Sequence, residues 1–270
     1  MQEIRDKAGE AYWTNVWEKS DLNPAIDLQS KDMHLYPQRA LHKIFSRLLK
    51  DVPVKGKKLV EIGCGNSSWL PYFSKHFGLD VYGIDYSEEG CEQAEKILQR
   101  ENVEGTIYCT DAFNPAEDLH SEFDIVLSFG VIEHFSETVS TLEAFSKYLK
   151  PGGLLITTIP NMSGLNGWLH KIMNRALYDI HVPLDRKQLS EAIRASGLKE
   201  ITTSYYIGVS LNVQLTDAGE PIKNFRMKRF ISKAGAGITL FFWWLEEKLG
   251  VFPQSKWFSR GIISIAQRPA

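Results

Sequence analysis

A short apolar run that ends in two glycines constrains this chain more than any other stretch. Residues 58–62 (KLVEI) are mostly apolar, and Gly63 and Gly65 follow at once. Such a run predicts a buried strand of a parallel sheet, and the glycines predict a tight turn against which a ligand can lie. Residues 66–68 (NSS) are helix-capping types, so a helix should begin there with its free N–H groups facing the turn. The stretch therefore predicts a strand–turn–helix ligand site.

This glycine turn differs from the fingerprint of a dinucleotide-binding site. In the pattern G-x-G-x-x-G the third glycine would fall at position 68, which is Ser68. Glu61, at the end of the predicted strand, would repel a pyrophosphate. It would suit a ligand that carries positive charge and no phosphate. The turn therefore argues against a nicotinamide dinucleotide.

At this point the sequence resembles the class I, Rossmann-like S-adenosylmethionine-dependent methyltransferases. Their first motif reads acid-x-Gly-x-Gly and stands here as residues 61–65 (EIGCG), while Ser67 replaces the usual third glycine. The resemblance covers residues 55–160 well and implies methyl transfer to a small molecule with S-adenosyl-L-methionine as the cofactor. It implies that the cofactor lies beside Glu61, Gly63, Cys64 and Gly65.

The rest of the chain alternates between strand and helix patterns. Further core strands are predicted at 80–85, 105–109, 123–128 and 154–159, and a final pair at 199–211 and 261–266. Alternation of this kind demands an α/β fold with a mostly parallel sheet. Together with the resemblance, it predicts a Rossmann-like seven-stranded sheet with helices on both faces. The last strand pair should close the sheet, and helical lid insertions should cover it.

Several polar residues at predicted strand ends are candidates to bind the cofactor. Asp85 lies 20 residues beyond Gly65, where Rossmann-like folds use a carboxylate for ribose hydroxyls. The alternative for Asp85 is an ordinary turn acid or helix cap. The resemblance implies that Asp111 and Ala112 meet the adenine, and the alternative for Asp111 is a cap of the following turn. Further predicted cofactor contacts are Tyr86, Ser128 and Trp13.

Three segments outside the core strands and helices are predicted to cover the site. Residues 1–50 form an N-terminal helical arm, in which the aromatic cluster 12–17 (YWTNVW) is either a lid over the cofactor or substrate or ordinary packing. Residues 51–270 form the methyltransferase core. Its insertions at 161–184 and 212–260 exceed the usual loop length and are predicted to form a cap on the acceptor side.

The second insertion contains a basic and aromatic segment, residues 225–249. It is expected to form one helix, or two hinged at Gly235 and Gly237. Aromatic residues at helical spacing are usually buried, so a cavity lid or ordinary packing is favoured. A basic amphipathic helix can also lie on a membrane surface, and a homodimer face is a third alternative.

Two histidines are candidate catalytic bases, because imidazole titrates near neutral pH. His134 follows the fourth strand, where the methyl group should be presented, and His181 lies in the insertion 161–184. A structural role is the alternative for each. These candidate bases favour a hydroxyl or carboxyl acceptor of a small molecule or peptide over a nitrogen or carbon acceptor. Further predicted acceptor contacts are Tyr12, Glu133, Asn161 and Tyr178, and no metal site is expected.

The composition argues against nucleic acid as a partner and against secretion. The net charge of −2 lacks the basic excess of a phosphate-binding surface. Three cysteines without framework spacing predict reduced thiols and a cytoplasmic protein. The charged N-terminus does not look like a signal peptide, and no apolar run reaches the roughly 18 residues of a membrane span. Two functions remain as alternatives to methyl transfer: a non-catalytic cofactor-binding protein on the same fold, and a nicotinamide-dependent oxidoreductase.

Overall fold

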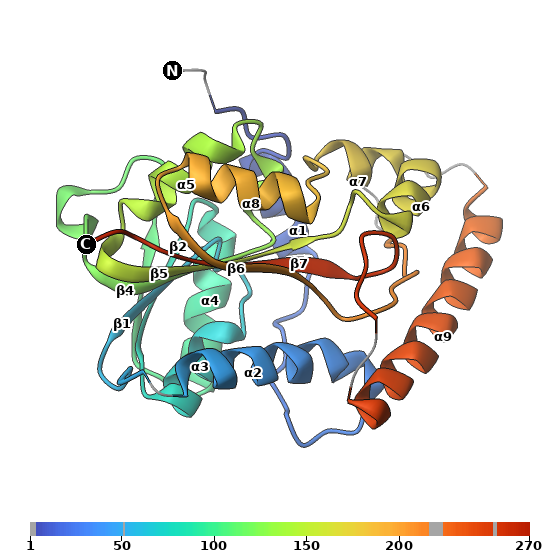
Figure 1. The fold of residues 1–270 in the computed structure, drawn as a ribbon, viewed down its shortest axis with the longest axis horizontal. Helices are drawn as coiled ribbons and strands as arrows, with labels where there is room; N and C mark the ends of the chain where they lie inside the picture. Colours follow the sequence, from blue (N-terminus) through green and yellow to red (C-terminus); the bar gives the residue numbers. More distant parts are fainter. Residues whose placement is uncertain (1–3, 51, 216–223, 251–252) are drawn as a thin grey trace.

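A seven-stranded sheet forms the middle layer of the molecule in a computed structural model that describes residues 4–50, 52–215, 224–250 and 253–270 (Figure 1). The strand order is β3-β2-β1-β4-β5-β7-β6, and β7 alone runs antiparallel to its neighbours. This arrangement confirms the predicted Rossmann-like sheet with its closing strand pair. The strands are β1 (Lys58–Ile62), β2 (Asp80–Asp85), β3 (Gly105–Cys109), β4 (Phe123–Phe129), β5 (Leu149–Pro160), β6 (Lys199–Tyr206) and β7 (Gly261–Gln267).

Helices cover both faces of the sheet, as predicted (Figure 1). Apolar side chains of α2, α3 and α4 pack on one face, and those of α5 and α8 pack on the other. The α-helices are α1 (Glu10–Glu18), α2 (Tyr36–Leu49), α3 (Trp69–Phe77), α4 (Glu88–Arg100), α5 (Thr138–Ser146), α6 (Leu165–Met173), α7 (Arg175–Asp179), α8 (Arg186–Ala195) and α9 (Phe225–Leu249). Short 3-10 helices are η1 (Met33–Leu35), η2 (Glu117–Leu119) and η3 (Ile132–His134).

Capping residues in the sequence define several helix starts. The Ser87 hydroxyl accepts a hydrogen bond from the Gly90 amide at 3.3 Å and begins α4. Asp185 and Gln188 form a reciprocal capping box at the start of α8. Because such bonds satisfy backbone amides that lack a partner in the first turn, they fix where each helix begins and hence where the preceding strand end points.

The position of β1 in the sheet determines where a ligand can bind. β1 pairs with β2 on one side and with β4 on the other, and all three run in parallel. After β1 the chain therefore adds β2 and β3 on one side of this strand. It then returns to add β4 and the remaining strands on the other side. The connections at the carboxyl ends of β1 and β4 separate at this point, which opens a crevice in folds of this type.

The two predicted insertions are helical. Residues 161–184 contain α6 and α7, and α9 is one continuous helix of 25 residues (Figure 1). Gly235 is therefore no hinge. A Cβ atom there would lie 2.4 Å from the backbone oxygen of Leu211, so this glycine allows α9 to pack closely on the preceding segment. No described helix is long and apolar enough to cross a membrane.

The aromatic residues of α9 are only partly buried, which corrects the expectation of a packed stripe. Trp243 is buried and donates its indole N–H to the Val209 oxygen at 2.8 Å. Phe241 and Trp244 are 57% and 46% exposed. The reason is that α9 contacts the rest of the chain along one narrow face, so that neighbouring aromatic positions point away from it.

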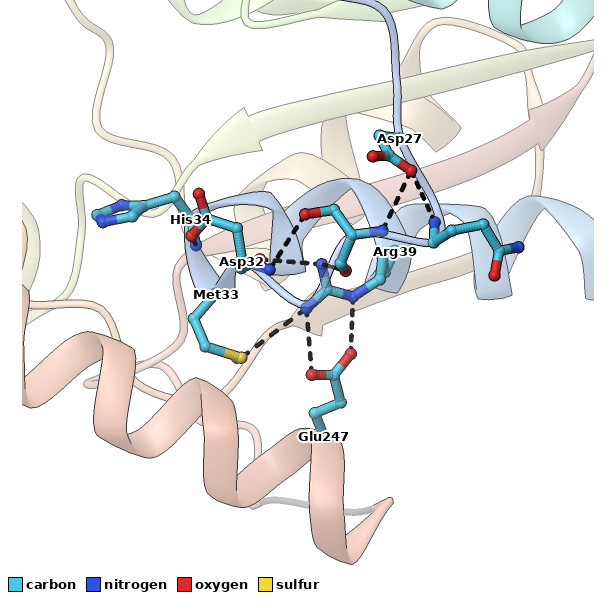
Figure 2. Close-up of polar contacts among 8 residues, drawn as sticks. Asp27, Asp32, Met33, His34, Arg39 and Glu247 are labelled. Carbon is cyan, nitrogen blue, oxygen red and sulfur yellow. Dashed lines mark hydrogen bonds and ion pairs between the residues drawn. The ribbon is translucent and has the colours of Figure 1, made fainter.

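A buried arginine fastens α9 to α2 (Figure 2). The Arg39 guanidinium donates to both carboxylate oxygens of Glu247, at 2.7 and 3.1 Å. It also donates to the carbonyl oxygens of Ser30 and Asp32, at 2.9 and 3.0 Å. One side chain therefore joins α9, α2 and the loop before η1, which holds α9 beside the open end of the sheet.

Candidate functional site

Two adjoining cavities lie at the carboxyl ends of β1, β2 and β4. They have volumes of about 240 and 430 Å³ and share Gly63, Asp85 and Tyr86 in their linings. The smaller cavity also touches Glu61, Gly65, Trp13 and Trp17. The larger one extends to Asp111 and Ala112. Eight of the ten predicted cofactor residues thus line these two cavities, whereas Cys64 and Ser128 are fully buried and line neither.

The backbone of the glycine turn comes close to its surroundings. Gly63 has a φ of +74°, which favours glycine, and a Cβ atom there would lie 2.6 Å from Val131 Cγ2. A Cβ atom at Gly65 would lie 2.9 Å from Asp85 Oδ2. Cys64 between them is fully buried, and its amide bonds the Ile84 oxygen at 3.2 Å. The turn therefore presents bare backbone to the crevice.

Asp85 connects the glycine turn to the start of α4. Its Oδ2 accepts a hydrogen bond from the Gly65 amide and its Oδ1 accepts one from the Ser87 amide, both at 2.9 Å. Burial raises the pKa of Asp85, and these bonds partly offset that rise. Each oxygen can accept a further bond, so the carboxylate can serve both as an anchor of the turn and as a partner for ribose hydroxyls.

Glu61 is a buried acid with one polar partner. Its Oε2 accepts a bond from the Ser67 hydroxyl at 2.7 Å. Burial raises the pKa of Glu61 to about 8, although the bond from Ser67 lowers it. A cationic ligand would favour the ionised form, and S-adenosylmethionine carries a sulfonium and an ammonium group. The two carboxylates of this crevice therefore fit the cofactor that the resemblance implies.

Trp17 is a candidate that the sequence analysis did not single out. Its indole nitrogen is buried and has no hydrogen-bond partner in the described part of the chain, and the ring lines the smaller cavity. It stacks on Trp13 at 5.7 Å between ring centroids, because residues four apart share one face of α1. Gly90 allows this position, since a Cβ atom there would lie 3.0 Å from the indole. The spacing of four residues between Trp13 and Trp17 was the signal in the sequence that could have identified Trp17.

The end of the crevice where the resemblance implies adenine contains Asp111 and Ala112, and each of them already has hydrogen-bond partners within the protein. Asp111 accepts bonds from the Phe113 amide and from Asn114 Nδ2, at 2.9 and 2.8 Å, so it caps the following turn as the alternative described. Ala112 is buried, and its oxygen accepts a bond from Tyr148. Tyr86 donates its hydroxyl to Asp6 at 2.9 Å, which ties the N-terminal arm to the crevice.

A third cavity of about 480 Å³ adjoins the smaller of these two and shares Trp69, Gly130 and His134 with it. It is enclosed by α2, by residues 158–181, by residues 206–214 and by Trp243 of α9. The two insertions and the arm thus supply most of its walls. Its polar lining includes Glu133, His134, His170 and His181.

Three of these polar residues form a cluster. His134 and His181 have ring centroids 4.5 Å apart, and Glu133 is 1% exposed. The Val182 amide donates to the backbone carbonyl oxygen of Glu133 at 2.6 Å, which holds the insertion against the end of β4. Residues almost 50 positions apart in the sequence therefore meet where the third cavity adjoins the cavity of about 240 Å³.

Hydrogen bonds fix the tautomer of both histidines in the cluster. His134 Nδ1 bonds the Ile180 oxygen at 2.9 Å, and His181 Nδ1 bonds the Leu177 oxygen at 2.6 Å. A carbonyl oxygen only accepts, so each Nδ1 must carry the proton and each Nε2 keeps its lone pair in the neutral ring. Burial lowers the pKa of His134 to about 4 and that of His181 to about 3. Burial raises the pKa of Glu133 to about 8.

The other predicted acceptor contacts lie elsewhere. Tyr12 packs edge-on against Trp13, and Tyr178 lies beneath the Lys171 ammonium. Asn161 is fully buried and donates to the oxygens of Lys256 and Ser259, at 2.8 and 3.0 Å, so it orders the loop before β7. As far as the described residues define the three cavities, these side chains line none of them.

Comparisons with known proteins agree with this arrangement. A family model described as a methyltransferase domain matches residues 32–203. A ubiquinone biosynthesis O-methyltransferase of Acinetobacter baumannii is 26% identical over 165 residues, which are 56% of this chain and 68% of that protein. A demethylmenaquinone methyltransferase of Staphylococcus saprophyticus is 34% identical over 122 residues, 43% of this chain and 50% of that protein.

The fold is also similar to that of a geranyl diphosphate C-methyltransferase from Streptomyces coelicolor, solved with S-adenosylhomocysteine. The TM-score is 0.57 at 13% identity, and the match covers 96% of this chain and 97% of the other. Identity this low supports the fold and leaves the acceptor open.

Proposed function

This chain belongs to the methyltransferase domain family, and we propose that it moves the methyl group of S-adenosylmethionine to an oxygen atom of a hydrophobic small molecule or peptide. As a member of the family it is an S-adenosylmethionine-dependent methyltransferase of small molecules. The observation that carries the oxygen assignment is the cluster of Glu133, His134 and His181. Two imidazoles with unprotonated Nε2 atoms line a cavity that adjoins the cofactor crevice.

Binding and orientation of the cofactor are assigned to the glycine turn and to two carboxylates. Asp85 would accept the ribose hydroxyls, and the buried Glu61 would balance positive charge at the methionine end. When bound, the cofactor supplies the activated methyl group, so the protein mainly has to supply alignment. Bare backbone at Gly63 and Gly65 lets the ligand lie close to β1.

The N-terminal arm is assigned the role of a lid. Trp13 and Trp17 of α1 line the cofactor cavity, and the hydroxyl of Tyr86 bonds Asp6 in the arm. The same reasoning makes the insertions 161–184 and 212–260 a cap over the acceptor, since His170, His181 and Trp243 line the third cavity. Closing the site with apolar rings excludes water, which strengthens electrostatic interactions inside it.

The acceptor oxygen is proposed to bind beside the cluster of Glu133, His134 and His181. A hydroxyl or carboxyl group there would donate its proton to Nε2 of His181 or His134 while the oxygen attacks the methyl group. A buried ring resists protonation. If the neighbouring Glu133 carboxyl group ionises when the ring takes up the proton, its negative charge would offset part of that cost. The relative from Acinetobacter baumannii is an O-methyltransferase by name, which supports oxygen.

The experiment is to identify the methylated atom. The purified protein is incubated with S-adenosylmethionine carrying a ¹³C-labelled methyl group and a panel of hydrophobic phenols, alcohols and carboxylic acids. The proposal expects a labelled methyl ether or ester, recognised by its ¹³C chemical shift. Label attached to carbon or nitrogen in the best acceptor would contradict the oxygen assignment. The double variant Gly63→Ala, Gly65→Ala serves as the control for background transfer.

A further inference from the structure

From the same cluster we infer that Glu133, His134 and His181 form a binding site for a divalent transition-metal ion of the Zn²⁺ type. Each residue offers one ligand atom, and these three atoms lie within 4.8 Å of one another. Two histidines and one glutamate are a ligand set of catalytic zinc sites, which keep a further position open. The amino-acid sequence alone predicts no metal site, because these residues meet only in the fold. The role of the ion in catalysis rests on the proposed function, whereas the binding site does not.

Both histidines are arranged as metal ligands. Metal-binding histidines commonly donate one ring N–H to a carbonyl or carboxylate, which orients the ring and leaves the other nitrogen for the metal. His134 and His181 do this through Nδ1, towards the oxygens of Ile180 and Leu177. His170 differs, although it lines the same cavity. Its Nδ1 bonds the Asn166 oxygen, and its Nε2 accepts a bond from the Gln214 amide, so both nitrogens are used.

Glu133 supplies the independent observation. The side chain is 1% exposed, and its Oε2 has no hydrogen-bond partner among the residues that the structure describes. A buried carboxylate oxygen without a partner is costly unless a charge or a donor compensates it. The Lys7 ammonium, whose charge acts on both histidines, donates to the His181 carbonyl oxygen at 2.6 Å. A divalent ion would satisfy the carboxylate and use both free Nε2 atoms at once.

The geometry requires a modest contraction. Ligand atoms bound to zinc at about 2.0–2.2 Å lie roughly 3.3 Å apart in a tetrahedral site, so the three side chains must close by about 1–1.5 Å. The rings of His134 and His181 already lie 4.5 Å apart between centroids. The open side of the cluster faces the third cavity, of about 480 Å³, where the acceptor is proposed to bind. With both Nε2 atoms bound to it, the ion would replace the histidine base. It would favour the ionised form of an acceptor hydroxyl, whose proton leaves to solvent.

The test measures metal binding directly. The full-length protein is stripped with a chelator and titrated with Zn²⁺ in a calorimeter, and the bound metal is counted by mass spectrometry after desalting. One ion per chain is expected. Glu133→Gln keeps the size of the side chain and removes its charge, so the affinity for Zn²⁺ should fall at least about tenfold. His170→Gln is the matched control in the same cavity and should leave that affinity unchanged.

Several outcomes separate this inference from the proposed function. A stripped protein that takes up no Zn²⁺, or a folded Glu133→Gln protein that binds it as tightly as the wild type does, overturns the metal site. Circular dichroism shows whether each variant is folded. One bound Zn²⁺ together with methyl transfer to carbon upholds the site and contradicts the proposed function. Methyl transfer to oxygen by a protein that binds no metal upholds the proposed function and contradicts the metal site.

Discussion

The indole nitrogen of Trp17 lies over Gly65, so closely that a Cβ atom on that glycine would be 2.8 Å from Nε1. One residue belongs to the N-terminal arm and the other to the turn after β1. The contact brings a buried N–H group without a partner in the described chain into the cavity that is proposed to hold the cofactor. The arm is therefore part of the proposed cofactor site, and its contribution can be measured.

Trp17→Phe should weaken binding of S-adenosylmethionine while leaving the fold intact. The substitution keeps an aromatic ring and removes the N–H donor, and one hydrogen bond is worth about 0.5–1.5 kcal/mol, or roughly two- to tenfold in affinity. Calorimetry of the wild type and the variant gives the ratio. Trp168→Phe, on an exposed tryptophan of α6, is the matched control and should not change the affinity. Equal affinities for all three proteins would remove Trp17 from the site.

Asp85→Asn should lower the affinity for S-adenosylmethionine by at least about tenfold, since hydrogen bonds to charged groups are worth about 1.5–3 kcal/mol each. The amide has the same shape but loses the charge, and it cannot accept from both backbone amides and from ribose hydroxyls equally well. Asp80→Asn, at the exposed start of the same strand, is the control. A folded Asp85→Asn protein with unchanged affinity would refute the ribose assignment.

Cofactor binding should release protons below pH 8 because of Glu61. Burial raises the pKa of this acid to about 8, so it is largely protonated in the free protein at pH 7. A cationic ligand favours the carboxylate, so binding expels the proton, and affinity should rise with pH until about 8 and then level off. Calorimetry in buffers of different ionisation enthalpy counts the protons. Glu61→Gln isolates this contribution from that of the ligand's own amine, and identical proton release in both proteins would contradict the assignment.

Arg39→Met should reduce the free energy of unfolding by about 2–4 kcal/mol, because it leaves Glu247 and two carbonyl oxygens without their donor. The guanidinium is mostly buried, whereas Glu247 is partly exposed, so solvent moderates the loss. Urea denaturation measures the change. Arg47→Met, on the exposed side of the same helix, should cost less than about 0.5 kcal/mol. Equal stability of the two variants would mean that the contact does not hold α9 in place.

The crevice that is proposed to hold the cofactor could be predicted from the sequence because its signals are local. The strand before Gly63, the glycine turn and the acid at Asp85 lie within 30 residues, and a parallel sheet brings strand ends together. For the proposed acceptor site, the sequence indicated individual candidate residues but did not show that they lie together. His134 and His181 were both candidates, but their contact depends on how the insertion folds back on β4.

Two features were beyond the reach of local patterns. Periodicity alone indicated a buried aromatic stripe on α9, although Trp244 and Phe241 are exposed, since a pattern does not say which faces find partners. The Oε2 atom of Glu133 lacks a hydrogen-bond partner because of the residues that surround it in the fold. The presence of a glutamate at position 133 of the sequence does not indicate this. Its place in a cluster could be recognised only in three dimensions.

The rate of methyl transfer by His181→Ala tests the central claim most directly. The measurement is single-turnover transfer from S-adenosylmethionine to the best oxygen acceptor at saturation, with cofactor affinity determined in parallel. If the cluster activates the acceptor, the rate should fall by about 10²–10⁴ while the affinity for S-adenosylmethionine stays within about threefold of the wild type. A rate that falls less than about threefold in a folded protein would contradict the account, because a general acid–base group contributes far more than that.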